Sequence, residues 1–116
     1  MKDFSNYHKV IKDRTDIEDM LRGGDPILQW EMMVKQFSLD IPTSVDFIKI
    51  ACTDEELYWL SEVFEDIAAK SHSAEFIQCI RERAALVEDS KRRADIQQEI
   101  EEWAVPALEA PEKDTQ

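Results

Sequence analysis

The side chains best suited to catalysis or metal binding in this sequence are two histidines, two cysteines and 26 carboxylates. His8 and His72 lie far apart in the sequence, and neither belongs to the His-Glu-x-x-His pattern of a zinc protease. Cys52 and Cys79 have no second thiol close by that would complete a zinc site. The sequence therefore contains no recognisable metal cage and no nucleophile paired with a base.

The two glycines, Gly23 and Gly24, do not form a recognisable phosphate-binding loop either. They are adjacent, and they lack the lysine and the hydroxyl residue that such a loop requires. A helix end is the better interpretation, because glycine readily adopts the left-handed conformation that terminates helices. We accordingly expect no cofactor.

Carboxylates are abundant enough that a hydrolase using two acids must be considered. Five of them fall within one predicted helix, with no lysine or arginine between them: Glu55, Glu56, Glu62, Glu65 and Asp66. Two catalytic acids need contrasting environments in a cleft, so that one stays protonated while the other ionises. One solvated helix face does not supply this contrast. We expect the protein not to be an enzyme, with no catalytic residue and no metal ligand.

The same helix carries the best candidate for a binding surface. Four of its residues are spaced by four, three and four positions and share one stripe of an ideal α-helix: Glu55, Trp59, Glu62 and Asp66. An aromatic ring among carboxylates suits a basic partner, because the ring stacks on arginine while the acids meet surrounding cations. The predicted partner-binding residues are Glu55, Tyr58, Trp59, Glu62, Glu65 and Asp66. The alternative is that Trp59 packs beneath a neighbouring helix and the acids only solvate the outside.

A second acidic set precedes Trp103 and consists of Asp95, Glu99, Glu101 and Glu102. It would extend the binding surface if it lay beside the first helix. Its heptad-like spacing is more typical of an ordinary exposed helix face, and we favour that interpretation.

The formal net charge of −12 narrows the choice of partner. It repels phosphate backbones and anionic membrane surfaces, so direct binding to nucleic acid or to a membrane is not expected. The same charge attracts a basic protein and speeds its capture. Solubility alone is an alternative reason for an acidic composition.

The elements that must position these residues are helices. Helix caps are frequent, whereas alternating strand patterns and hairpin turns are missing. We predict an all-α fold, a single-domain bundle of about six short to medium helices over residues 1–105, followed by a flexible C-terminal tail at 106–116.

Capping residues predict where the helices begin. In chain order, the predicted starts are a capping box at 15–18, Asp25-Pro26, Thr43 or Ser44, a capping box at 53–56, Ser73, and Asp89 or Ser90. Residues 43–50 are the one place where a strand is also conceivable, although a helix is favoured. The long helix opened at 53 has an apolar inner face formed by Leu57, Leu60, Val63, Phe64 and Ile67.

The chain carries signs of a cytoplasmic location. Its N-terminus lacks the apolar core of a secretion signal, and no apolar run approaches the roughly 20 residues of a membrane span. Cys52 and Cys79 lie among apolar neighbours, and we interpret both as reduced core residues rather than as a disulfide.

The acidic, aromatic segment 54–67, followed by the helix start Ser73-Ala74-Glu75-Phe76-Ile77, resembles a known bacterial family. It is similar to the small helical immunity proteins encoded beside the toxins of contact-dependent growth-inhibition (polymorphic toxin) systems. This resemblance covers roughly the second half of the chain.

The resemblance implies an intracellular antidote that binds a basic toxin domain, expected to be a nuclease, and neutralises it by protein-protein interaction. A nuclease must be basic to hold its substrate, so an acidic protein can occupy the same surface. The alternatives are a phage- or plasmid-type acidic nucleic-acid mimic and an acidic adaptor protein.

Overall fold

The computed structural model describes residues 3–19 and 26–109. In chain order these residues form α1 (Ser5–Asp19), α2 (Ile27–Leu39), α3 (Ile41–Ile50), α4 (Asp54–Leu60), the 3-10 segment η1 (Ser61–Val63), α5 (Phe64–Ser71), α6 (Ala74–Ala84), α7 (Ser90–Glu99), the π-helical segment η2 (Ile100–Ala104) and α8 (Val105–Glu109). Because η1 and η2 join their neighbours without a break, the described residues form six helical rods and no strand. The predicted all-α bundle is confirmed.

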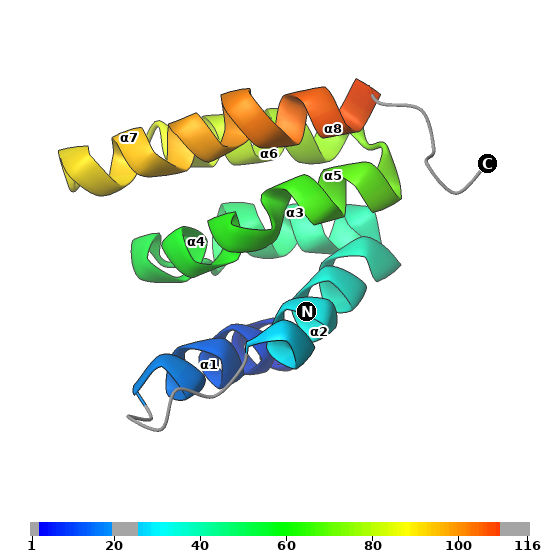
Figure 1. The fold of residues 1–116 in the computed structure, drawn as a ribbon, viewed down its shortest axis with the longest axis vertical. Coiled ribbons are helices and arrows are strands. Elements are labelled where there is room, and N and C mark those ends of the chain that lie inside the picture. Colours follow the sequence, from blue (N-terminus) through cyan, green and yellow to red (C-terminus); the bar gives the residue numbers. More distant parts are fainter. Residues whose placement is uncertain (1–2, 20–25, 110–116) are drawn as a thin grey trace.

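The six rods stack as three layers of two (Figure 1). The first layer contains α1 and α2, the second contains α3 and the α4–η1–α5 rod, and the third contains α6 and the α7–η2–α8 rod. The α5 helix contacts α2 on one side and η2 and α8 on the other, while α3 contacts α6. The α4–η1–α5 rod, which we call the central rod, carries the predicted binding residues. It therefore lies between the two outer layers.

The apolar side chains of all three layers meet in a single hydrophobic cluster. Phe37, Phe47, Phe64 and Phe76 are among its largest fully buried side chains. The predicted inner face of the long helix is confirmed, since each of its five residues is at most 1% exposed. These contacts hold the central rod in one orientation relative to the outer layers.

Three of the predicted caps are confirmed. Thr53 accepts a hydrogen bond from the backbone N–H of Glu56, and the Glu56 carboxylate accepts one from the N–H of Thr53. Ser73 caps α6 by accepting from the N–H of Phe76, and Asp89 caps α7. His72 ends α5 with a positive φ of 50°, a left-handed conformation that stops a helix.

The predicted cap at Thr43 or Ser44 is wrong, although the favoured helix there is confirmed. Asp40 caps α3 by accepting from the backbone N–H of Thr43. Ser44 is fully buried instead, where its hydroxyl donates to the carbonyl of Phe37 and lies 3.0 Å from the hydroxyl of Tyr7. Interlayer packing therefore uses the Ser44 hydroxyl that a cap would have required.

The predicted helix start at Thr15 is also wrong. Thr15 lies inside α1, which begins at Ser5, and its hydroxyl donates to the carbonyl of Lys12 one turn earlier. Burial of Tyr7, Val10 and Ile11 explains the earlier start, because these side chains share a helical face that joins the core. The predicted helix end at Gly23-Gly24 lies outside the described residues.

The last rod continues beyond residue 105, the predicted end of the helical domain. A π-helical turn, in which the N–H of Val105 donates to the carbonyl of Ile100, leads directly into Pro106, and α8 extends to Glu109. Such a turn widens the backbone just before a proline whose ring would clash with an ordinary helical carbonyl. Ala107 and Leu108 then pack against the core. Residues 110–116 lie outside the described part.

Cys52 and Cys79 are both free and buried, as predicted. Burial raises the pKa of the Cys52 thiol to about 12 and that of Cys79 to about 11, which makes both poor nucleophiles. None of the helices in residues 3–19 and 26–109 is long and apolar enough to cross a membrane.

Candidate acidic binding groove

The structure divides the six predicted binding residues among several environments. Tyr58, Trp59 and Glu62 line one open pocket of about 580 Å³, which we call the first pocket. Asp66 lines a second pocket of about 360 Å³ between α2 and α5. Glu55 is exposed at the start of α4 and lines neither pocket. The 3-10 turn at η1 contributes to this division, because its tighter winding shifts the residues after it away from the stripe of an ideal α-helix.

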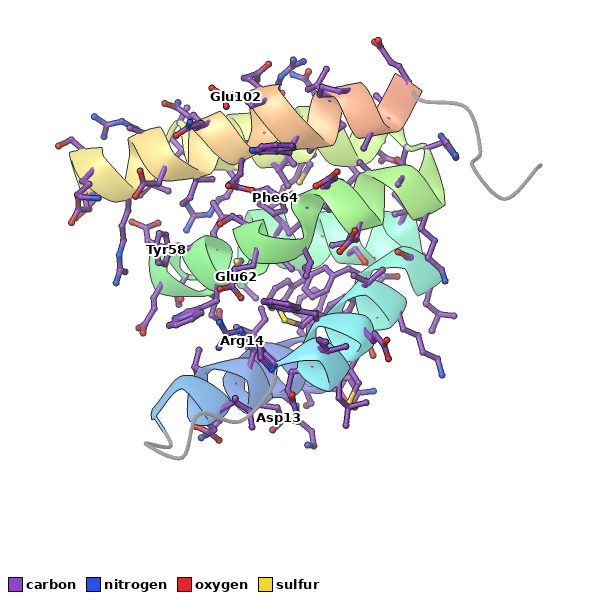
Figure 2. All side chains as sticks on the ribbon, viewed as in Figure 1. Asp13, Arg14, Tyr58, Glu62, Phe64 and Glu102 are labelled. Carbon is purple, nitrogen blue, oxygen red and sulfur yellow. The ribbon has the colours of Figure 1, made fainter. Side chains whose placement is uncertain are left out.

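Glu62 is engaged within the protein. Its carboxylate accepts two hydrogen bonds from the guanidinium of Arg14, at 2.8 and 2.9 Å, and a third from the indole N–H of Trp30 at 2.9 Å. The Arg14 side chain is 6% exposed and the Glu62 side chain 30%. Figure 2 shows Arg14 of α1 and Glu62 of the central rod directed toward one another. Glu62 therefore ties the first layer to the second.

Arg14 lines the first pocket, and the sequence analysis missed it. Its guanidinium carbon lies 4.9 Å from the centre of the Trp59 ring and 5.9 Å from that of Trp30, distances typical of cation–π contacts. A signal for its burial was available, because Arg14 lies three residues after Ile11 on the buried face of α1.

Trp59 combines features of the two interpretations made from the sequence, a partner-binding residue and a residue packed beneath a neighbouring helix. It is partly buried and packs against the core, yet it also lines the first pocket. Its indole nitrogen is buried and has no hydrogen-bond partner among the described residues. Tyr58 packs edge-on against Trp59, and the guanidinium of Arg92 lies 4.9 Å from the centre of the Tyr58 ring. The two rings form an aromatic wall that already contacts two arginines.

Part of the second acidic set lies beside the central rod, contrary to the interpretation favoured from the sequence. Asp95 and Glu99 of α7 line the first pocket opposite Glu62. Partial burial raises the pKa of Glu99, and the charges of Glu65, Glu102, Asp95 and Glu62 raise it further, in that order. We call the carboxylates of the two facing rods, Glu62, Glu65, Asp95 and Glu99, the acidic groove.

The rest of the second set behaves as an ordinary helix surface. Glu101 forms a two-pronged ion pair with Arg81 of α6, in which both hydrogen bonds measure 2.8 Å. Glu102 accepts a hydrogen bond from Gln98 one turn earlier on its own rod. These two carboxylates therefore stand apart from the pocket lining.

The negative charge of the acidic groove is only partly balanced within the protein. Arg14 neutralises Glu62, and Lys91 lies 3.4 Å from the carboxylate of Asp95. Glu65 and Glu99 form no ion pair with the described residues. Within this part of the chain, no group of three or more acidic, histidine or cysteine side chains is arranged to hold a metal ion.

The chain matches no protein-family model, and comparisons with curated proteins and with solved structures also found no match. The resemblance of segment 54–67 to immunity proteins therefore stays a prediction.

Proposed function

We propose that this protein binds a basic protein domain at the acidic groove and neutralises it, as an immunity protein neutralises its toxin. The observation that carries this proposal is the lining of the first pocket by Glu99 of α7, whose carboxylate lies within electrostatic reach of Glu65 on α5. Neither carboxylate has a cationic partner among the described residues, and their repulsion contributes to the raised pKa of Glu99. Because like charges held close together oppose folding, a partner that brings cations would reduce an electrostatic repulsion already present in the folded protein.

The chemistry of the first pocket suits arginine or lysine side chains of a protein. Carboxylates from two rods line this pocket together with the aromatic wall formed by Tyr58 and Trp59. A guanidinium can accept this arrangement by pairing with an acid while stacking on a ring, as Arg14 already does with Glu62 and Trp59. The guanidinium of Arg92 stacks on Tyr58 in a similar way. A phosphate backbone would meet repulsion from the same groove and from the net charge of −12.

A nuclease toxin is the partner that fits best with both the charge and the resemblance. Its active surface must be basic in order to hold a polyanion, and the acidic groove would occupy that surface in place of nucleic acid. Protection would take place in the cytoplasm of the producing bacterium, where the substrate of such a toxin is found.

A protection assay tests this proposal. The toxin domain encoded beside this gene is expressed in a bacterial host with and without the protein, and colony formation is counted. We expect survival to rise by at least about a thousandfold with the protein, because tight capture leaves little free toxin. A toxin that kills equally well in its presence, or a genome in which no toxin domain adjoins this gene, would contradict the immunity function.

Matched charge reversals connect the assay to the groove. The double variant Glu65→Lys/Glu99→Lys should lose protection, whereas Glu75→Lys/Glu82→Lys on α6 changes the net charge by the same amount at residues that do not line the first pocket and should keep it. Protection that survives the double variant would move the binding surface elsewhere. Inhibition of an unrelated nuclease, without protection against the neighbouring toxin, would favour the acidic nucleic-acid mimic.

A further inference from the structure

Helix α2 exposes an apolar stripe that no other described element covers. Leu28 is 59% exposed, Met32 42% and Leu39 74%, and their spacing places them on one face of the helix with Lys35 between Met32 and Leu39. Together with Ile27, they account for four of the seven large exposed hydrophobic residues in the described part of the chain. The opposite face of α2 is anchored in the core by Met33 and Phe37.

Helix α1, in the same outer layer, has a different surface. Two pairs of oppositely charged residues, Lys9 with Asp13 and Lys12 with Asp16, follow one another along it at helical spacing. The terminal layer of a stack of helices needs such polar side chains to remain soluble. The stripe on α2 departs from this rule, and clustered exposed apolar residues commonly mark a contact surface.

The two charged residues of α2 are of opposite sign, so each could pair with the other in a second copy of the helix. Glu31 and Lys35 are the two charged residues of this helix, and neither forms an ion pair with another described residue. Both line the second pocket, where Asp66 and Lys70 of α5 are likewise without an ion pair in the described part of the chain. Two anions and two cations make this patch neutral, although the protein as a whole carries a net charge of −12.

We propose that a second copy of this chain covers the stripe, with the two α2 helices packed antiparallel about a twofold axis. In this register Leu28 faces Leu39 of the second copy, and Met32 faces the aliphatic part of Lys35. Glu31 then lies one position from the opposing Lys35, so that two equivalent ion pairs form across the axis. The self-complementary order of acid and base favours a second copy over a basic partner, which would leave Lys35 facing like charge.

The interface should be weak and should depend on salt in a characteristic way. A helix of 13 residues is about 20 Å long, so its outer ridge buries an area at the low end for specific interfaces. The two bodies also repel, because each carries a net charge of −12. Added salt screens that repulsion and should strengthen self-association, whereas it should weaken capture of a basic partner.

The stripe is separate from the first pocket, since none of Leu28, Met32 and Leu39 lines it. Self-association can therefore be measured without any toxin, and its outcome is independent of the proposed immunity function. Sedimentation equilibrium from about 1 to 300 µM should show half-association at about 10–100 µM in moderate salt. A protein that stays monomeric throughout this range would overturn the proposal, whatever else covers α2.

A charge exchange on α2 is the sharper test. Glu31→Lys alone places two lysines opposite one another, and Lys35→Glu alone places two acids there, so each should weaken the dimer by at least about tenfold. The double variant Glu31→Lys/Lys35→Glu restores the opposite pairs and should recover self-association. Both residues are exposed, so the fold should be unaffected, which circular dichroism checks. Failure of the double variant to recover would contradict the antiparallel register.

An apolar control separates the stripe from general stickiness. Met32→Glu should abolish the dimer, whereas Leu86→Glu, at a residue that is 71% exposed but lies between α6 and α7, should leave it intact. Equal loss of self-association in both variants would show that it is nonspecific and would overturn the assignment to α2.

Discussion

Arg14 of α1 and Glu62 of η1 are 48 residues apart in sequence, and they form a two-pronged ion pair beside the ring of Trp59. The guanidinium is almost fully buried, whereas the carboxylate is partly open to solvent. This pair makes Glu62 a structural residue at the edge of the acidic groove, with consequences that can be measured.

Removal of Glu62 should destabilise the protein more than removal of a neighbouring acid. Glu62→Ala leaves the buried guanidinium of Arg14 without its carboxylate, and we expect the free energy of unfolding to fall by about 3 kcal/mol. Glu65→Ala removes a carboxylate of the same rod that has no ion pair. It should change the free energy of unfolding by less than about 0.5 kcal/mol. Urea unfolding followed by circular dichroism compares the two. Equal stabilities would mean that the ion pair contributes little.

Truncation of Trp59 should affect stability as well as binding. Its ring packs on the core and on Arg14, so Trp59→Ala should lower the free energy of unfolding by about 3 kcal/mol through lost burial and a cavity. Trp103 is 50% exposed, and Trp103→Ala should cost about 1 kcal/mol or less. Thermal melting of both variants compares these losses of stability. A Trp59→Ala protein as stable as the wild type would return this residue to a purely partner-binding role.

The stability of the protein should depend on the charge of Glu99. Its pKa is raised in the folded protein, so the folded state binds the proton more tightly than the unfolded state does. Stability from this group is fully present below the usual carboxyl pKa and is lost as pH rises through the raised value. Glu99→Gln should therefore melt at a slightly higher temperature than the wild type at about pH 7, with the difference shrinking toward about pH 3. The opposite trend would show that Glu99 is stabilised by an attractive contact.

Charge reversal in the acidic groove should slow association with the proposed basic partner. Glu65→Lys and Glu99→Lys should each reduce the association rate constant by about tenfold at low salt, while Glu82→Lys should have a smaller effect. Because Glu99→Lys also removes a repulsion, its folded state should remain stable, and slow binding cannot be attributed to unfolding. Stopped-flow measurements from about 50 to 500 mM salt should show the wild-type rate falling steeply. A flat salt response would leave the acidic composition with a role in solubility alone.

Local interactions were predictable from the sequence because their donors and acceptors are a few residues apart. The caps at Thr53, Ser73 and Asp89 each join a side chain to a backbone N–H within one turn. The apolar face of the central rod followed from helical periodicity in the same way. Asp40 in place of Thr43 or Ser44 shows the limit of this reasoning, since several residues could cap α3 and packing of Ser44 decided between them.

The candidate site depended on information that is spread along the chain. The charge of Glu65 acts on Glu99 because α5 packs against the last rod, and nothing in either segment specifies that neighbour. The 3-10 turn at η1 also divided a stripe that an ideal α-helix would have kept continuous.

The sequence by itself determined the helical class, three of the six predicted helix starts, the buried face of the central rod and the strong negative charge. These properties follow from periodicity, short-range hydrogen bonds and composition. Only the tertiary structure decided that Glu62 pairs with Arg14, that the charge of Glu65 acts on Glu99, and that Leu28 and Met32 stay exposed on α2. The physical reason is that each of these outcomes depends on which helices pack together, and packing is settled by the burial of the whole core rather than by any local pattern.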